Sequence, residues 1–505
     1  MDWLMDPSAH VRTWQQWLPV AGALALGVSL ATLQRRGGDI HKRGARVLQG
    51  LQRRRAVLRR PSTHASVTFA GVPIAMNEET RHFKLIGTTG TGKSTAISAL
   101  LGRALERGDR AVITDPDGGY RAQFYDRHRG DVILNPFDRL SVKWDPFSEI
   151  REPWDVDQLS AGLIPTCEDA SGREWRGYSR TFLTAVMRRC CESGWRDANE
   201  LWRLLTVATS AELRALVAGS PAQPFLEPDN ARMFSSIRSV AGSAAAALEY
   251  VQGQRARAFS VREWVQSGSG VLFIPYGAAQ IPALKAVIAT WVRLAIFEGM
   301  MTRADEDQRL WFVVDELDSL GAIDGLKDAL ARLRKFGGRC VLGFQSISQV
   351  SSAYGGGEAN TIVENCGNSL ILRCSGSEHG GTSQFASRLI GEREVTRIST
   401  SRSQRSTELF SSITRAEHLS VEPAVMVSEI EQLPDLAGYL KLASRAEWQR
   451  VRLQRPVRRE RVEEALIGAR ILAFPARPRA PTESAGMVST AEPQRSGVAD
   501  GLEHE

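Results

Sequence analysis

The octapeptide GTTGTGKS, Gly87 to Ser94, constrains the fold more than any other stretch, because it fits the phosphate-loop pattern G-x-x-x-x-G-K-[ST]. The apolar run FKLIG predicts a buried strand before it, and the Ala/Leu-rich run from Thr95 to Leu105 predicts a helix after it. Glycines let the backbone curl so that several N–H groups point at one phosphate, and a helix N-terminus adds partial positive charge. Lys93 would then reach the β- and γ-phosphates, and the Ser94 hydroxyl would bind Mg²⁺. We therefore expect a nucleotide to bind Gly87, Thr88, Thr89, Gly90, Thr91, Gly92, Lys93, Ser94 and Thr95.

A second apolar strand ends in two acidic residues. In RLWFVVDEL, Arg309 to Leu317, the apolar residues are followed by Asp315 and Glu316. Two adjacent carboxylates at the end of a buried strand are costly unless a cation compensates them. We expect Asp315 to enter the Mg²⁺ shell, directly or through water, and Glu316 to orient and activate the attacking water. Together with the phosphate loop, the acidic pair predicts hydrolysis of a nucleoside triphosphate.

Further apolar runs surround these two motifs and indicate the fold class. They are RAVITDPDGGY (110–120), DVILNPF (131–137), GVLFIPYG (270–277) and RCVLGFQSISQV (339–350). Short apolar strands that alternate with helical segments are typical of an α/β protein with a mainly parallel sheet and helices on both faces. Asp115 ends one strand where open α/β sheets bind ligands, but it can equally cap the turn that follows.

A helical region interrupts this pattern. From 151 to 264, strand signals nearly vanish and helical periodicity takes over. We expect an all-α domain there, inserted into a nucleotide-binding domain made of residues 61–150 and 265–455. Within the second part, the serine-rich segment Ser399 to Ser412 predicts a flexible loop, and Tyr439 to Arg452 predicts a pair of strands. The composition of residues 475–505 predicts a disordered tail.

One stretch near the N-terminus is apolar enough to cross a membrane. Trp17 to Leu33 is uncharged, and Trp14 and Trp17 stand at one edge, where interfacial aromatic residues belong. Basic residues follow this stretch rather than precede it, which argues against a cleaved signal peptide and places the rest of the chain in the cytoplasm. We expect residues 1–34 to be an anchor with one transmembrane helix at about 17–33. The alternative is an apolar helix buried in a soluble core.

The net charge of +7 belongs to one short segment. Between Arg35 and Arg60 there are ten Lys/Arg and one acidic residue, a local +9, so the rest of the chain is close to neutral. This basic juxtamembrane segment, residues 35–60, suits anionic lipid headgroups or DNA phosphate, and lipid is the simpler interpretation beside a spanning helix. The six cysteines include no CxxC pair, which argues against a disulfide framework or a zinc site.

Two further polar residues are candidates for the site. Gln345 ends the strand that begins near Arg339, from where an amide can hydrogen-bond the γ-phosphate or the attacking water. Arg334 lies on the preceding predicted helix, Leu326 to Gly337. It is either an ordinary surface arginine or an arginine finger that acts on the nucleotide of the next subunit.

These motifs in combination resemble the type IV coupling proteins of bacterial conjugation, the TraD/TraG-like DNA-transfer ATPases. The likeness runs from about Pro61 to Leu442 and rests on FKLIGTTGTGKST, VITDPDGGY, VILNPF, WFVVDELDSL, LRKFGGRCVLGFQSISQV and SRLIGEREV. The resemblance implies a RecA-like P-loop core that carries an all-α domain, is anchored in the inner membrane, forms a homo-hexameric ring and hydrolyses ATP with Mg²⁺. The family's site residues fall on Lys93, Ser94, Asp315, Glu316, Gln345 and Arg334, the last as an arginine acting in trans. Many members have two membrane helices, whereas this sequence has one candidate.

The resemblance and the residues together predict a membrane-anchored, ATP-driven DNA translocase. It would bind DNA, single-stranded and without sequence preference, and would link the relaxase and its relaxosome to a type IV secretion channel in the bacterial inner membrane. Two alternatives stay open. One is an FtsK- or HerA-like DNA-pumping ATPase for segregation or repair, and the other is a substrate-recruiting receptor whose nucleotide site does not hydrolyse.

Overall fold

The computed structural model describes residues 40–50, 67–166, 169–301, 309–377, 380–403 and 412–455. All of them belong to the first of two compact units, residues 1–469. The expected transmembrane helix at 17–33, most of the basic segment 35–60 and the tail 475–505 lie outside the described residues. These three assignments therefore stay predictions.

In the described part of the chain, ten strands form one large sheet in the order β2-β17-β16-β13-β5-β12-β11-β6-β10-β7. The strands are β2 (Val47–Leu48), β5 (Phe83–Ile86), β6 (Arg110–Pro116), β7 (Val132–Ile133), β10 (Val271–Tyr276), β11 (Leu310–Val314), β12 (Arg339–Phe344), β13 (Asn368–Ile371), β16 (Ala437–Lys441) and β17 (Trp448–Arg452). The strands from β13 to β7 are parallel to their neighbours, whereas β16 pairs antiparallel with β13 and β17. The expected mainly parallel sheet is confirmed, as is the strand pair at its end.

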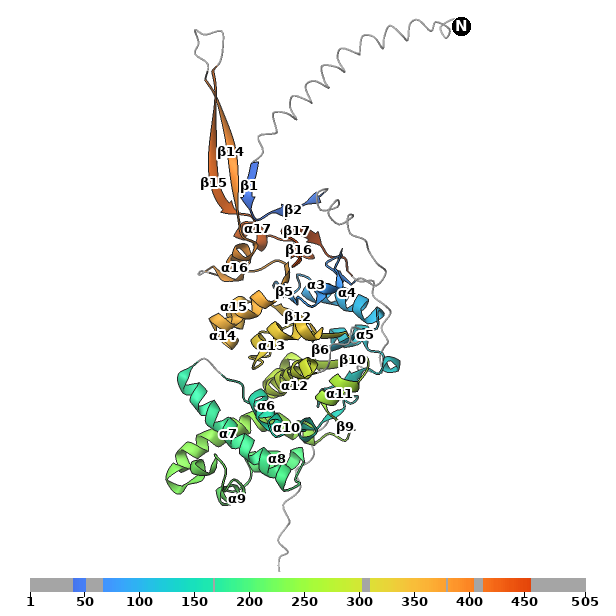
Figure 1. The fold of residues 1–505 in the computed structure, drawn as a ribbon, viewed down its shortest axis with the longest axis vertical. Helices are drawn as coiled ribbons and strands as arrows, with labels where there is room; N and C mark the ends of the chain where they lie inside the picture. The colour runs from blue at the N-terminus through green and yellow to red at the C-terminus, as the bar shows by residue number, and fades with distance from the viewer. Residues whose placement is uncertain are drawn as a thin grey trace, which may run out of the picture. The chain divides into compact units, whose positions relative to one another are not determined.

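Helices cover both faces of this sheet (Figure 1). Trp311 and Val313 of β11 pack into one hydrophobic core with helix α4, whereas Phe312 and Val314 pack into a second core with α12 and α13. Strands buried on both faces are continuous apolar runs, as in the sequence. The helices around the sheet are α3 (Met76–Glu79), α4 (Lys93–Glu106), α5 (Gly119–Phe124), α11 (Val261–Ser267), α12 (Ile281–Met301), α13 (Leu326–Leu333), α14 (Ile347–Tyr354), α15 (Gly356–Asn365), α16 (Gly381–Ile390) and α17 (Val427–Glu431).

The segment expected to be helical folds as α-helices and short 3₁₀ turns. Its α-helices are α6 (Asp155–Leu163), α7 (Ala170–Glu192), α8 (Ala198–Thr206), α9 (Ser210–Leu216) and α10 (Ala231–Gln252). The short parallel pair β8 (Lys143–Trp144) and β9 (Ala258–Phe259) joins the two ends of this segment. Its core is continuous with the core beneath α12. The domain boundaries at 151 and 264 therefore stay a prediction.

Among the described residues, one helical stretch, Ala278–Met301, is long and apolar enough to cross a membrane by length and composition. Most of it is buried inside the protein, and Trp291 packs edge-on against Trp144 with ring centroids 5.8 Å apart. Its apolar character is explained by this burial against the sheet. It is a core helix.

Two smaller sheets complete the described fold. The first pairs β3 (Thr68–Phe69) with β4 (Val72–Pro73). The second is three-stranded, in the order β1-β14-β15, with β1 (Ile40–Gly44), β14 (Glu392–Ser403) and β15 (Ser412–Pro423). The prediction of a loop at Ser399 to Ser412 is thus wrong at both ends of that range, because β14 extends to Ser403 and β15 begins at Ser412. Serine and arginine suit a strand here because the long ladder supplies their backbone hydrogen bonds.

A buried histidine links the start of β5 to β12. The Nε2 of His82 donates to the Leu330 carbonyl at 2.9 Å, and its Nδ1 accepts from the Cys340 N–H at 3.1 Å. Burial lowers the pKa of His82 to about 4, because the charged ring loses water and a second proton would face the Cys340 N–H. The folded state therefore prefers a neutral ring.

This pKa predicts a loss of stability in mild acid. Because the folded pKa lies below the ordinary 6.5, the stabilisation is complete above pH 6.5 and is lost as the pH falls toward 4. At pH 5 the His82 contribution should be about 2 kcal/mol lower than at pH 7.5. Urea unfolding at both pH values should show this difference in the wild type and a smaller one in His82→Gln. Equal pH dependence in the two proteins would contradict the assignment.

Candidate nucleotide-binding site

The phosphate loop joins β5 to α4 at the carboxyl edge of the sheet. The Thr88 N–H donates to the Arg373 carbonyl at 2.9 Å, which ties the loop to the chain after β13. Gly90 and Gly92 have φ values of +78° and +113°, in the left-handed region where glycine is favoured. A Cβ on Gly92 would stand 2.8 Å from the Leu436 side chain, whereas one on Gly90 would meet no atom within 4 Å. The loop conformation expected from its glycines is present.

Lys93 is held inside this loop. It is buried, and its Nζ donates to the Gly87 carbonyl at 2.6 Å and to the Thr88 carbonyl at 3.4 Å. Burial lowers the pKa of Lys93, and the nearby charges of Asp315, Asp318 and Glu316 oppose that shift. A cation among carboxylates beside curled backbone N–H groups suits a polyphosphate.

Ser94 and Asp315 meet although they are distant in sequence. The Ser94 hydroxyl donates to Asp315 Oδ2 at 2.6 Å, and the Tyr120 hydroxyl donates to the same oxygen at 2.7 Å. Among the described residues, the buried Oδ1 of Asp315 has no hydrogen-bond partner. A buried carboxylate with an unpartnered oxygen is costly, and with a serine hydroxyl it provides the hard oxygen donors that Mg²⁺ prefers. These two residues therefore fit the ion predicted for them.

Gln345 connects the phosphate loop with the acidic pair. Its Oε1 accepts from the Thr89 hydroxyl at 2.8 Å, and its Nε2 donates to Glu316 Oε1 at 3.3 Å. Glu316 is half-buried, and burial raises its pKa, as do the charges of Asp315 and Asp318. A glutamine in this position contacts both the phosphate loop and the acidic pair, so it can respond to a change at either one.

Asp115 caps helix α5. Its two carboxylate oxygens accept from the backbone N–H groups of Tyr120 and Arg121, at 2.9 and 2.7 Å. Burial raises the pKa of Asp115 to about 6. Of the two interpretations of Asp115, the capping role is confirmed, and its consequence is to position Tyr120 against Asp315. We did not expect Tyr120 from the sequence, where its place five residues after Asp115 was the available signal.

Arg334 is not brought to this site within its own chain. It begins the 3₁₀ turn η6 (Arg334–Phe336), is exposed, and lies close enough to His82 to lower the pKa of that ring. His82 precedes β5, so Arg334 lies at the amino edge of the sheet, opposite the phosphate loop. An arginine finger at this position stays a prediction about a neighbouring subunit.

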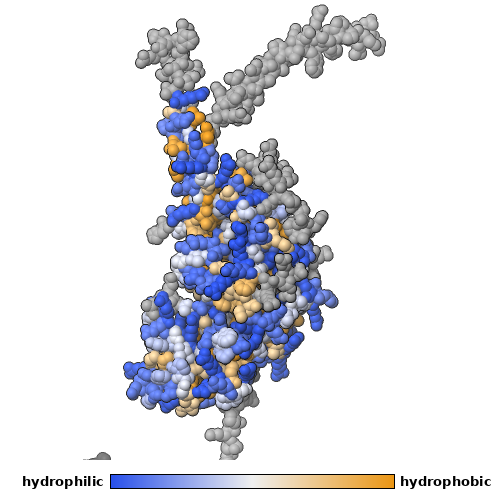
Figure 2. Space-filling view, viewed as in Figure 1, coloured by the Kyte–Doolittle hydropathy of each residue, from blue (hydrophilic) through white to orange (hydrophobic). Residues whose placement is uncertain are grey.

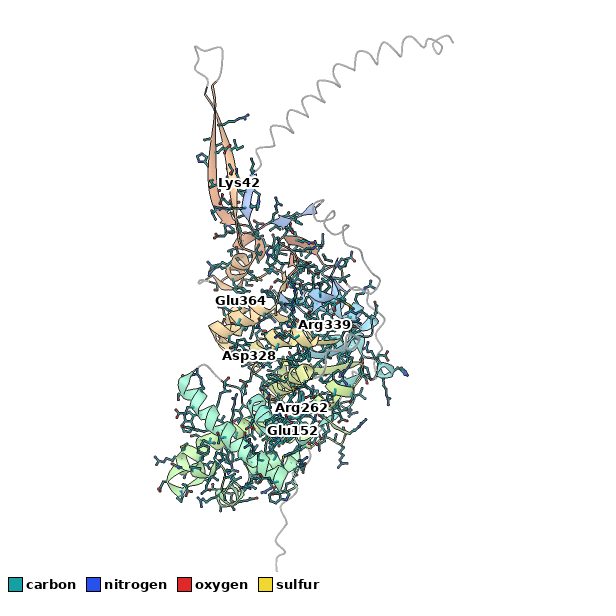
Figure 3. All side chains as sticks on the ribbon, in the orientation of Figure 1. Lys42, Glu152, Arg262, Asp328, Arg339 and Glu364 are labelled. Carbon is teal, nitrogen blue, oxygen red and sulfur yellow. The ribbon has the colours of Figure 1, made fainter. Side chains whose placement is uncertain are left out.

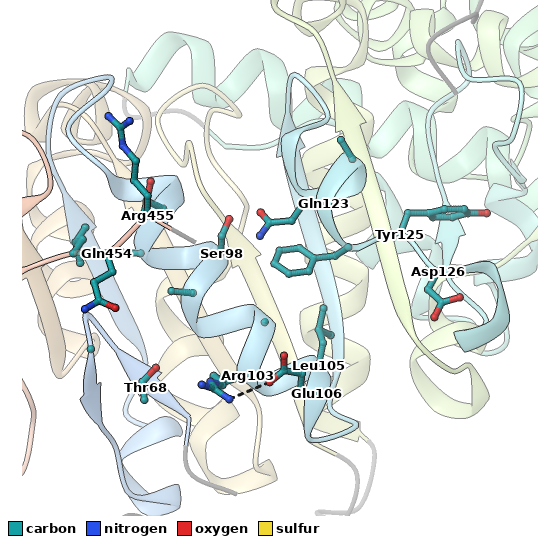
Figure 4. A pocket seen from close by; sticks show the side chains of 18 of the residues that line it. Thr68, Ser98, Arg103, Leu105, Glu106, Gln123, Tyr125, Asp126, Gln454 and Arg455 are labelled. Atoms are coloured by element: carbon teal, nitrogen blue, oxygen red, sulfur yellow. Dashed lines mark hydrogen bonds and ion pairs between the residues drawn. The ribbon is translucent and has the colours of Figure 1, made fainter. Parts of the chain in front are cut away.

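A groove of about 1800 Å³ follows the outer side of α4. It begins beside the loop at Thr95 and is flanked by α5 on one side and by Gln454 and Arg455 on the other (Figure 4). Arg103 and Glu106 form an ion pair at its far end. Of the residues predicted to bind the nucleotide, its lining includes Thr95 alone, so the groove lies beside the phosphate loop rather than at the phosphates.

The parallel sheet, the phosphate loop and the acidic strand end define a P-loop NTPase. More specifically, the chain belongs to the family described as the type IV secretion-system coupling protein DNA-binding domain, whose model matches residues 66–454. The family resemblance seen in the sequence is confirmed.

Among curated proteins, the chain is 30% identical over 395 residues to the coupling protein TraD of Escherichia coli (strain K12), covering 76% of this chain and 54% of TraD. It is 23% identical to a conjugal transfer protein TraG of Escherichia coli, covering 70% of this chain and 62% of TraG. The chain thus spans little more than half the length of these relatives.

Solved structures agree with this placement. The unbound conjugative coupling protein TrwBdeltaN70 is 31% identical, with a TM-score of 0.76 over 85% of this chain and 96% of that one. TrwB in complex with ADP and Mg²⁺ is 31% identical, with a TM-score of 0.73 over 84% of this chain and 95% of that one. TrwB with the ATP analogue ADPNP is 30% identical, with a TM-score of 0.74 over 85% and 97% of the two chains. The RecA-like fold expected from the family is therefore shared.

Proposed function

We propose that the chain is the ATP-driven DNA translocase of a conjugative transfer system, anchored in the bacterial inner membrane. The observation that carries the proposal is the 2.6 Å contact between Ser94 and Asp315, beside the buried Lys93. Family membership supports it, as does the TrwB complex with ADP and Mg²⁺.

In this proposal the phosphates of ATP lie in the loop between Gly87 and Thr95. Lys93 pairs with the phosphate oxygens, and Ser94 and Asp315 hold the magnesium ion, with Tyr120 fixing the carboxylate. The ion, when bound, neutralises charge on the β- and γ-phosphates. Bound ATP and Mg²⁺ thereby stabilise both kinds of side chain, because the phosphates compensate the charge of Lys93 and the ion compensates the charge of the carboxylates.

Glu316 would orient the attacking water and accept its proton. Its raised pKa favours this role, because a base is most effective when its pKa approaches the working pH. Gln345, in contact with Thr89 and Glu316, would move when the phosphates change and pass that movement to adjoining loops. Arg334 would complete the site of the next subunit in a homo-hexameric ring.

DNA is the proposed cargo, consistent with the DNA-binding description of the family. We expect contacts to phosphate, which need no base readout, so sequence preference should be weak and binding should weaken with salt. Because the chain outside residues 35–60 is close to neutral, a DNA channel must come from arginines placed locally. Relaxase and relaxosome proteins would deliver the DNA, and type IV secretion channel subunits would receive it.

Lys93→Ala tests this proposal against a receptor with a non-hydrolytic site. Without the ammonium group the phosphates lose their main cationic partner, so DNA transfer between cells should fall at least about a thousandfold. The exposed Lys285→Ala is the control and should transfer normally. Undiminished transfer by Lys93→Ala, with normal amounts of protein in the membrane, would favour the receptor. Normal transfer in a deletion strain would favour a segregation or repair ATPase.

A further inference from the structure

One face of the three-stranded sheet β1-β14-β15 carries four exposed apolar side chains, together with Glu394, the exposed Glu417 and the buried Thr396. Side chains of cross-strand partners lie on the same face, and the register pairs Ile40 with Thr396, Thr396 with Leu419, and Glu394 with Val421. Ile398 follows Thr396 by two residues and shares its face. Four apolar side chains of this face are exposed: Ile40 at 48%, Ile398 at 42%, Leu419 at 63% and Val421 at 65%. We call these four residues the apolar hairpin face.

The opposite face of the same strands carries paired charges beside the buried Val395. Glu422 accepts from Arg393 at 2.8 Å and from Arg397 at 2.7 Å. His418, next to Leu419 in sequence, is exposed on this side. The two faces therefore differ sharply over the same strands, and in Figure 2 hydrophobic residues are visible along the hairpin. An exposed apolar patch of this kind marks an interaction surface.

We propose that the apolar hairpin face lies against the lipid surface of the membrane. β1, which carries Ile40, follows the apolar stretch that ends at Leu33. The residues between them, 34–39, can separate the two by at most about 25 Å. The inference rests on the proposed membrane anchoring, since a helix at 17–33 would bring β1 and its sheet to the cytoplasmic surface of the bilayer.

The charges around the face suit anionic lipid headgroups. Lys42 and Arg43 of β1 and the adjacent Arg46 are exposed, and Lys42 is labelled on β1 in Figure 3. Arg43 also pairs with Glu394 on the apolar side at 2.6 Å, which reduces the charge that this carboxylate presents to lipid. Apolar side chains flanked by basic ones are typical of segments that lie in the membrane interface.

The test uses the full chain in vesicles of phosphatidylcholine and phosphatidylglycerol, with an environment-sensitive NBD label at position 419 or 418. Leu419→Cys places the label on the apolar hairpin face, and His418→Cys places it on the charged face one residue away. Cys167 and the partly exposed Cys191 are first changed to serine. The other cysteines, Cys190, Cys340, Cys366 and Cys374, are buried, and burial raises the pKa of each thiol, so they label poorly.

Lipids with a nitroxide group on the acyl chain should quench the label at 419 at least about twofold more than the label at 418, because interfacial segments reach about 5–10 Å into this region. Val421→Cys should behave like Leu419→Cys. Equal quenching at 418 and 419 in protein that floats with the vesicles overturns the proposal, as does cross-linking of position 419 between two copies without lipid quenching. If the protein does not float with the vesicles, both this proposal and the proposed membrane anchoring are overturned. ATP hydrolysis in detergent tests the nucleotide site separately.

Discussion

Replacing Glu316 with glutamine should lower the ATP turnover number about 10²- to 10⁴-fold while ATP still binds, the range that a positioned general base contributes. The amide keeps the size of the side chain and can still contact Gln345, but it cannot accept a proton. Lys93, Ser94 and Asp315 are unchanged, so the phosphates and the ion keep their partners. Turnover under saturating ATP, together with fluorescent-nucleotide binding, measures both quantities.

The pH profile adds a second check on the same residue. Burial raises the pKa of Glu316, so turnover by the wild type should rise with pH as this carboxyl loses its proton. Glu316→Gln should lack that rise. Asp318→Asn is the matched control, because Asp318 lies nearby but accepts from the Gln345 backbone N–H rather than from its side chain. If Asp318→Asn lowers turnover as much as Glu316→Gln does, the assignment of Glu316 as the base is contradicted. It is also contradicted if Glu316→Gln loses ATP binding together with turnover.

Gly92→Ala should destabilise the protein by about 2–4 kcal/mol, combining the cost of a left-handed backbone with a steric clash. The new Cβ would stand 2.8 Å from Leu436 Cδ2 and 3.1 Å from Leu453 Cδ1. The Leu436 backbone is held beside the loop, because its N–H donates to the Thr91 carbonyl at 2.9 Å. Relief of the clash therefore requires the Leu436 and Leu453 side chains to rotate away from the loop. Urea unfolding without nucleotide measures the change in the free energy of unfolding.

Gly90→Ala separates the cost of a left-handed backbone from the cost of the steric clash. Gly90 has a φ of +78°, but a Cβ there would meet no atom within 4 Å, so only the backbone cost of about 1–2 kcal/mol applies. In Gly92→Ala, a second change, Leu436→Ala, should recover part of the loss by removing the clash. Equal destabilisation by the two glycine variants would show that the contact with Leu436 does not constrain the loop.

The central part of the site could be predicted because its signals are local. The phosphate loop carries its own strand and helix, and Asp315 and Glu316 directly follow an apolar run. The carboxyl ends of adjacent parallel strands meet at one edge of a sheet, so Gln345 was expected near them. The contact from Gln345 to Thr89 and Glu316 agrees with that expectation.

The rest depended on contacts between distant parts of the chain. Tyr120 matters because α5 returns its hydroxyl to a carboxylate on another strand, and its spacing from Asp115 does not by itself show that contact. The packing of Leu436 on Gly92 likewise joins the end of the fold to its first loop. The β14–β15 hairpin was missed at the serine-rich segment Ser399 to Ser412, where few residues are apolar and the ladder itself supplies the stabilisation.

ATP hydrolysis by the purified full chain, with and without single-stranded DNA at low salt, is the most direct test of a DNA-driven ATPase. We expect magnesium-dependent turnover that DNA increases several-fold and that Lys93→Ala abolishes. Turnover that no DNA stimulates, or that persists in Lys93→Ala, would contradict it.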